Sequence, residues 1–193
     1  MEFANIQMTK IAIISGSGEL PILIGNNLIK KKYEIFFLGI KNFVNSELYN
    51  NYNYEEISIT SFTKILRYLK KNNIDNIIMV GKVNRPSIKD VKFDLNTLSI
   101  IKDFLLESQG DDQLLSTISK FFLKKGYPLF DWVNECPELF SNEIYLTKKK
   151  PTKKAILNKD KGIKIFNNFG KIDIGQSLII QNQLVISIST IST

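Results

Sequence analysis

One stretch near the N-terminus, IAIISGSGELPI at residues 11–22, restricts the fold more than any other part of the chain. Residues 11–14 form a short, continuous apolar run, which is typical of parallel strands that are buried on both faces. Gly16 and Gly18 come directly afterwards, and glycine permits both a tight turn and the close approach of another group to the main chain. Pro21 suits the first turn of a helix, where its missing N–H is not needed. The stretch therefore predicts a buried strand, a Gly-Ser-Gly turn and a helix.

The turn formed by Gly16, Ser17 and Gly18 is a candidate phosphate-binding site, because the free amides at a helix start favour anions. The turn departs from the dinucleotide fingerprint G-x-G-x-x-G, since Pro21 replaces the third glycine. The next predicted strand, at residues 34–38, is followed by Gly-Ile-Lys, without a carboxylate for a ribose hydroxyl. These departures disfavour a nicotinamide cofactor and an oxidoreductase. A tight turn without any ligand stays open as the alternative.

The chain contains no histidine, which excludes His-based catalytic triads and His-containing metal sites. Cys136 is the single cysteine, so no disulfide framework is expected, and a cytoplasmic location is the simple inference. The 193 residues, 44% hydrophobic and 23% charged, fit a soluble globular protein with either one good core or one domain and part of a second. The sequence offers no apolar run long enough to span a bilayer and no signal peptide.

Buried strands and helices alternate from residue 11 to residue 127, which predicts an α/β fold with a Rossmann-like, mostly parallel sheet. Strands are expected at residues 11–14, 34–38, 57–59, 76–80 and 127–130. Helices are expected at residues 21–31, 62–71, 96–107 and 112–124. The segment 41–55, rich in Asn and Tyr, is interpreted as a loop.

The sequence GKVNRPS at residues 81–87 forms a loop at the carboxyl end of a predicted strand. Open α/β sheets bind their ligands on that side. Lys82 and Arg85 are both long enough to reach a phosphate there. A basic surface loop is the alternative, and the position of the loop favours the binding site.

Asp111 and Asp112 stand at the start of the predicted helix 112–124. Adjacent carboxylates at such a place usually cap the helix and interact with its dipole. They are also suitable oxygen ligands for Mg²⁺. From spacing alone the capping role is preferred.

Residues 141–193 differ from the rest in charge, with nine Lys against three acidic residues. A solvated lysine face is preferred over a nucleic-acid platform, because no aromatic side chains alternate with these lysines. Thr152 is expected to cap a helix that ends near residue 168, and residues 176–181 and 184–189 are expected to form a hairpin. The predicted domains are therefore residues 8–140 and 141–193. A helix and one hairpin cannot bury their own apolar faces, so the second domain is expected to be incomplete or to pack on the first.

Four motifs follow one another along nearly the whole chain: GSGELP at 16–21, GKVNRPS at 81–87, GDDQLL at 110–115, and GKIDIGQ with LIIQN at 170–182. In this order they resemble the LpxI-type UDP-2,3-diacylglucosamine pyrophosphatases of lipid A biosynthesis. The resemblance implies a Rossmann-like N-terminal domain and a C-terminal α/β domain. It also implies Mg²⁺-dependent hydrolysis of UDP-2,3-diacylglucosamine to UMP and 2,3-diacylglucosamine 1-phosphate (lipid X).

The resemblance and the residues agree on phosphate chemistry. The expected phosphate-binding residues are Gly16, Ser17, Gly18, Lys82 and Arg85, and the expected metal ligands are Asp111 and Asp112. The family's catalytic carboxylate is expected beyond Thr193, so we expect a truncated chain with negligible activity alone. A non-catalytic nucleotide-binding or phosphate-binding domain is the alternative function.

The expected partner is a lipid-linked nucleotide substrate, and nucleic acid is not expected to bind. Because residues 141–193 are basic, an anionic membrane surface is a further alternative partner, and peripheral contact with the inner membrane is the expectation that follows from it. The predicted C-terminal hairpin has an unpaired edge, which leads us to expect a homo-oligomer.

Overall fold

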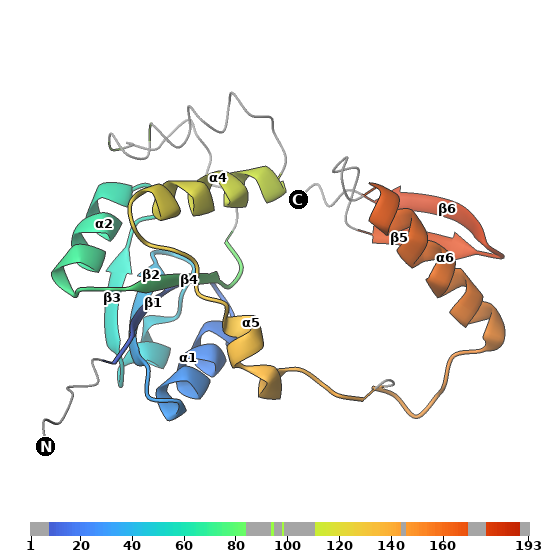
Figure 1. Ribbon diagram of the computed structural model, residues 1–193, viewed down its shortest axis with the longest axis horizontal. Coiled ribbons are helices and arrows are strands. Elements are labelled where there is room, and N and C mark those ends of the chain that lie inside the picture. The colour runs from blue at the N-terminus through green and yellow to red at the C-terminus, as the bar shows by residue number, and fades with distance from the viewer. Residues whose placement is uncertain are drawn as a thin grey trace, which may run out of the picture. The chain divides into compact units, whose positions relative to one another are not determined.

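The computed structural model describes residues 8–83, 94, 98, 111–143, 146–169 and 177–189 (Figure 1). The chain divides into two compact units, Met1–Phe140 and Ser141–Thr193, which are described separately. Within the described ranges, no helix combines the length and the apolar character needed to cross a membrane.

The first unit is built on a parallel sheet in the order β3-β2-β1-β4 (Figure 1). Its strands are β1 Lys10–Ser15, β2 Glu34–Ile40, β3 Asn53–Ile57 and β4 Asn76–Val80. β1 lies inside the sheet, where Ile13 is paired with Phe37 of β2 and with Ile78 of β4, both in parallel. The predicted α/β fold with a parallel sheet around residues 11–14 is thereby confirmed.

Both faces of the sheet are covered, which explains why residues 11–14 of β1 are all apolar. Successive side chains of a strand point to opposite faces. Ala12 and Ile14 accordingly join one hydrophobic cluster, whereas Ile11 and Ile13 join the other. Helices α2 Phe62–Lys71 and α4 Asp111–Lys124 contribute to the first cluster, and α1 Leu20–Lys30 contributes to the second.

A glycine in the middle of α1 lets this helix lie close to the sheet. Gly25 is buried, and a Cβ built on it would lie 2.3 Å from Cζ of Phe37 in β2. The third glycine of the dinucleotide fingerprint serves the same close packing of helix on strand. Gly25 therefore supplies, farther along the helix, the contact that Pro21 cannot provide.

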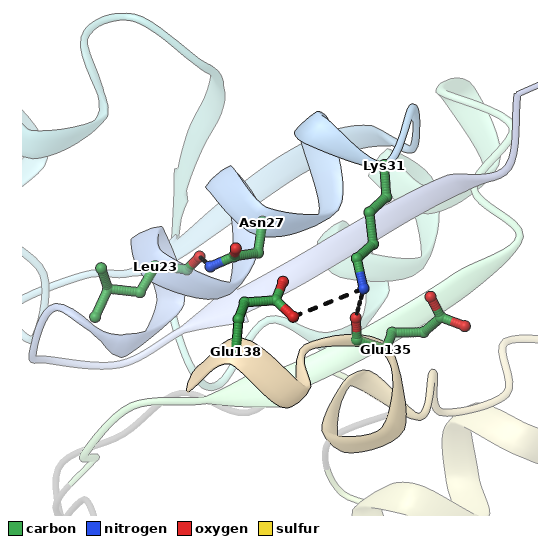
Figure 2. Close-up of polar contacts among 5 residues, drawn as sticks. All are labelled: Leu23, Asn27, Lys31, Glu135 and Glu138. Atoms are coloured by element: carbon green, nitrogen blue, oxygen red, sulfur yellow. Dashed lines mark hydrogen bonds and ion pairs between the residues drawn. The ribbon is translucent and has the colours of Figure 1, made fainter. Parts of the chain in front are cut away.

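The end of the first unit returns to α1 through a short helix, α5 Trp132–Glu135, and a 3₁₀ turn, Pro137–Leu139. Figure 2 shows the Lys31 ammonium donating to the Glu135 carbonyl, with the Glu138 carboxylate 3.8 Å away. The ion pair is partly exposed and contributes little on its own. Cys136, fully buried in the second hydrophobic cluster, anchors the same segment.

Three local predictions in this unit were wrong: the strand at 57–59, the loop at 41–55 and the strand at 127–130. The third strand runs over Asn53–Ile57 instead of 57–59, and the segment interpreted as a loop also contains the 3₁₀ turn Ser46–Tyr49. β3 pairs only with β2 among the described strands, so its outer side chains are exposed and polar, and no apolar run marks it. Near residues 127–130, a single parallel bridge joins Leu129 to Ile77 in place of a full strand. Pro128 lacks the N–H that a longer ladder would need.

The second unit contains α6 Lys153–Phe169 and an antiparallel hairpin, β5 Ser177–Gln181 and β6 Leu184–Ser189. Thr152 caps α6 as predicted, since its Oγ1 accepts the Ala155 N–H at 3.2 Å. Asn182 and Gln183 have φ values of 51° and 60°, as a tight two-residue turn requires. The Asn158 side-chain oxygen accepts the Gln183 N–H at 2.8 Å and so ties the turn to α6.

Candidate functional site at the carboxyl edge of the sheet

The carboxyl ends of β1 and β4 flank the point where the strand order changes direction. The chain runs from β1 through β2 to β3 on one side, and then crosses to place β4 on the other side of β1. Ligands of open α/β sheets bind in the crevice at such a switch point. The two loops that leave this edge, residues 16–19 and 81–83, carry most of the described candidate residues.

Backbone hydrogen bonds join these two loops directly. The Gly16 N–H donates to the Val80 carbonyl at 2.9 Å. Ser17 and Lys82 exchange a pair of bonds, Ser17 N–H to the Lys82 carbonyl at 2.8 Å and Lys82 N–H to the Ser17 carbonyl at 3.0 Å. The Ser17 hydroxyl adds a third bond, to the same Lys82 carbonyl at 3.0 Å. We call this group of contacts between residues 16–17 and 80–82 the loop clasp.

Two facing glycines make the loop clasp possible. A Cβ on Gly16 would lie 2.6 Å from the Lys82 carbonyl oxygen and 2.7 Å from Cγ2 of Val83. A Cβ on Gly81 would lie 2.7 Å from the Gly16 carbonyl carbon, and Gly81 has φ +100°, which other residues rarely adopt. The second loop thus fills the space beside Gly16. The sequence analysis did not predict that Gly81 contacts Gly16. The available signal was the position of a glycine directly after the buried strand 76–80.

Gly18 has different surroundings from Gly16. Its φ is +102°, and a Cβ there would meet no atom within 4 Å. Among the described residues, neither its N–H nor that of Glu19 has an acceptor. Such free amides before a helix of 11 residues are suitable donors to an anion.

The charges at this edge are mixed. Glu19 is the exposed N-cap residue of α1, and its side chain makes no capping bond. Its carboxylate opposes the approach of an anion, whereas the exposed ammonium of Lys82 on the neighbouring loop favours it. The structure brings together Gly16, Ser17, Gly18 and Lys82 as residues of one local edge.

Two tyrosines, the buried Tyr49 and the half-buried Tyr54, lie on the β2 side of the same edge. Burial raises the pKa of Tyr49, and a hydrogen bond with Ser15 at the end of β1 partly offsets that shift. The Tyr54 hydroxyl covers Gly39, where a Cβ would lie 2.6 Å from it. Burial and then the Glu56 carboxylate raise the pKa of Tyr54, so both phenols are neutral at ordinary pH.

The side chains of the remaining candidate residues lie outside the described part of the chain. Arg85 lies outside the described residues, as does the predicted helix 96–107. Asp111 and Asp112 begin α4, and their side chains are likewise outside the description. In the part of the chain that the structure describes, no three Cys, Asp or Glu side chains gather as a metal site. Binding of Mg²⁺ therefore has no support from the described side chains.

Two family models match the chain in sequence. The LpxI N-terminal domain matches residues 10–139, and the LpxI C-terminal domain matches residues 142–192. The chain is also similar to the UDP-2,3-diacylglucosamine pyrophosphatase LpxI of Caulobacter vibrioides, at 24% identity over 182 residues. The similarity covers 94% of this chain and 65% of that protein, so the chain spans about two thirds of its length.

Proposed function

The chain belongs to the LpxI family, and from that membership we propose that it takes part in the hydrolysis of UDP-2,3-diacylglucosamine to UMP and 2,3-diacylglucosamine 1-phosphate. The observation that carries the proposal is the pair of family matches, which follow each other in order over residues 10–139 and 142–192. The named relative is a UDP-2,3-diacylglucosamine pyrophosphatase.

The first unit is proposed to bind the nucleotide diphosphate. Its switch point lies at the carboxyl edge, where open α/β sheets take ligands, and the amides of Gly18 and Glu19 are free of described acceptors there. Lys82 supplies a positive charge on the adjacent loop. A group that neutralises the charge of the pyrophosphate lowers the barrier to attack on phosphorus.

The metal requirement is a proposal from the family resemblance. Mg²⁺ would polarise a phosphoryl oxygen and orient the leaving group. Asp111 and Asp112 remain the candidates to hold it.

The test is a turnover assay on the full chain with UDP-2,3-diacylglucosamine in detergent micelles, with Mg²⁺ or with EDTA. Release of UMP above the enzyme-free rate supports the proposal. Lys82→Gln should raise KM about threefold to tenfold, because one charged contact to phosphate is lost. Lys70→Gln is the matched control, since it removes an exposed lysine from the last turn of α2 at the opposite edge of the sheet.

A binding titration with UDP accompanies the assay. Binding of UDP without turnover would contradict hydrolysis by this chain alone, and it would fit both the expected truncated chain and the alternative, a non-catalytic nucleotide-binding domain. If the chain neither binds UDP nor releases UMP, the proposal is contradicted.

A further inference from the structure

We propose that Ser17 is a positioning residue, whose hydroxyl holds the backbone of Lys82 in the place from which its ammonium serves a phosphate ligand. The inference rests on the proposed function, because it needs a phosphate-bearing ligand at the carboxyl edge. It differs from the sequence-based expectation, in which Ser17 was itself a phosphate-binding residue.

The contacts of Ser17 point to this indirect role. Its hydroxyl donates to the Lys82 carbonyl at 3.0 Å, so its proton is already used. Its N–H donates to the same carbonyl, and its own carbonyl accepts the Lys82 N–H. All three polar groups of Ser17 are thus directed to the main chain of one residue. A residue whose amide and hydroxyl protons are both engaged has no proton left for a phosphate oxygen.

The Lys82 side chain, in contrast, takes no part in the loop clasp. The loop clasp uses only the main chain of Lys82, and the residue is exposed. A lysine side chain has four rotatable carbons and is a weakly directed point charge. Where its backbone is held therefore decides which region its ammonium can reach.

Substitutions can test Ser17 and Lys82 independently, because each one removes a different interaction. Ser17→Ala removes the hydroxyl bond and keeps both backbone bonds, while Lys82→Gln keeps all three. Ser17→Thr keeps a hydroxyl at the same position. The wild type, Ser17→Ala, Lys82→Gln and the double variant Ser17→Ala/Lys82→Gln form a complete cycle, and Ser17→Thr is the rescue control outside it.

The experiment is calorimetric titration of the full chain and these variants with UDP. We expect Ser17→Ala to weaken binding about threefold to tenfold and Ser17→Thr to restore most of the affinity. Lys82→Gln should weaken binding at least as much. The double variant should bind no more weakly than Lys82→Gln alone, because Ser17 acts through Lys82.

Each other outcome overturns the inference in a recognisable way. If the wild type binds UDP and Ser17→Ala binds equally well, or if the two losses add, Ser17 does not act through Lys82. If the wild type itself binds no UDP, the inference fails, and the turnover assay decides separately whether the proposed function fails with it. Hydrogen exchange provides a measurement that needs no variant: rapid exchange of the Lys82 amide in the folded wild type would show that the loop clasp does not hold.

Discussion

Gly16 and Gly18 lie two residues apart in one turn, yet alanine should affect them differently. At Gly16 the added Cβ would overlap the Lys82 carbonyl and Val83, so the loop clasp would have to separate. We expect Gly16→Ala to lower the free energy of unfolding by about 3 kcal/mol or more. At Gly18 the space is open and only the backbone angle is unfavourable, so Gly18→Ala should cost about 1–2 kcal/mol.

Urea unfolding of the two variants measures this difference. The m-value of each variant is the control, since a changed slope would mean a changed denatured state. Equal losses of stability for Gly16→Ala and Gly18→Ala would contradict the close contact between the two loops.

Tyr68 provides a second prediction at this scale. Burial, and then the Glu55 carboxylate, raises the pKa of Tyr68 to about 12 from its ordinary value of 10.0. The folded state therefore keeps the phenol neutral after the unfolded chain has ionised it. The stability that this group contributes is complete below the pKa of the unfolded chain. It is lost as the pH rises from that value through the folded pKa.

Tyr68→Phe keeps the ring but cannot ionise. Its free energy of unfolding should fall less steeply than that of the wild type over that alkaline interval. Denaturant unfolding at several pH values tests the slope, and the same two proteins at pH 7 provide the reference. Parallel slopes for variant and wild type would show that Tyr68 titrates normally.

Among the elements, α1 is fixed to β2 by the contact between Gly25 and Phe37. Alanine normally stabilises a helix interior by about 1 kcal/mol relative to glycine. Here its Cβ would lie 2.3 Å from Cζ of Phe37, so we expect Gly25→Ala to destabilise the protein by about 1–3 kcal/mol.

A smaller partner should relieve this overlap. In a Phe37→Leu background, Gly25→Ala should cost clearly less than in the wild type, so that the two substitutions show a favourable coupling. Thermal unfolding of the four proteins of this cycle measures the coupling. Strictly additive effects would mean that α1 shifts away from the sheet instead of pressing on Phe37.

The sequence predicted those elements whose signals are local. Residues 11–14 and 77–80 are apolar runs because both faces of the sheet are covered. Thr152 supplies the capping oxygen of α6, and Asn182 and Gln183 adopt the positive φ angles of a tight turn. The position of β3 was mispredicted because a strand with exposed Asn53, Glu55 and Glu56 has no apolar run.

The sequence predicted at which edge of the sheet the candidate site lies, but it did not predict the contacts between its two loops. Strand ends of a parallel sheet meet at one edge, and so Gly16, Ser17, Gly18 and Lys82 could be assigned to it from sequence. The pairing of Gly16 with Gly81 and the bonds between Ser17 and Lys82 depend on how two loops, 65 residues apart, meet in space. No local pattern contains that information.

At the scale of the whole molecule, the two units differ in how much apolar surface they bury. Every member of the two hydrophobic clusters belongs to the first unit. In the described part of the second unit, no hydrophobic side chain is buried, and Leu184 and Ile186 are 64% and 58% exposed. Because hydrophobic burial is the dominant favourable term in folding, the first unit should carry nearly all of the stability.

Separate expression of residues 8–140 and 141–193 tests this difference. Residues 8–140 should unfold cooperatively, at a temperature close to that of the full chain, since they retain both clusters. Residues 141–193 should lose their circular dichroism signal gradually on heating, because a helix and a two-stranded hairpin without a core are marginal in water. Concentration series for both pieces serve as the control, since association would supply the missing burial. A sharp, concentration-independent transition for residues 141–193 would mean that α6 and the hairpin stabilise each other through polar contacts such as the bond between Asn158 and Gln183.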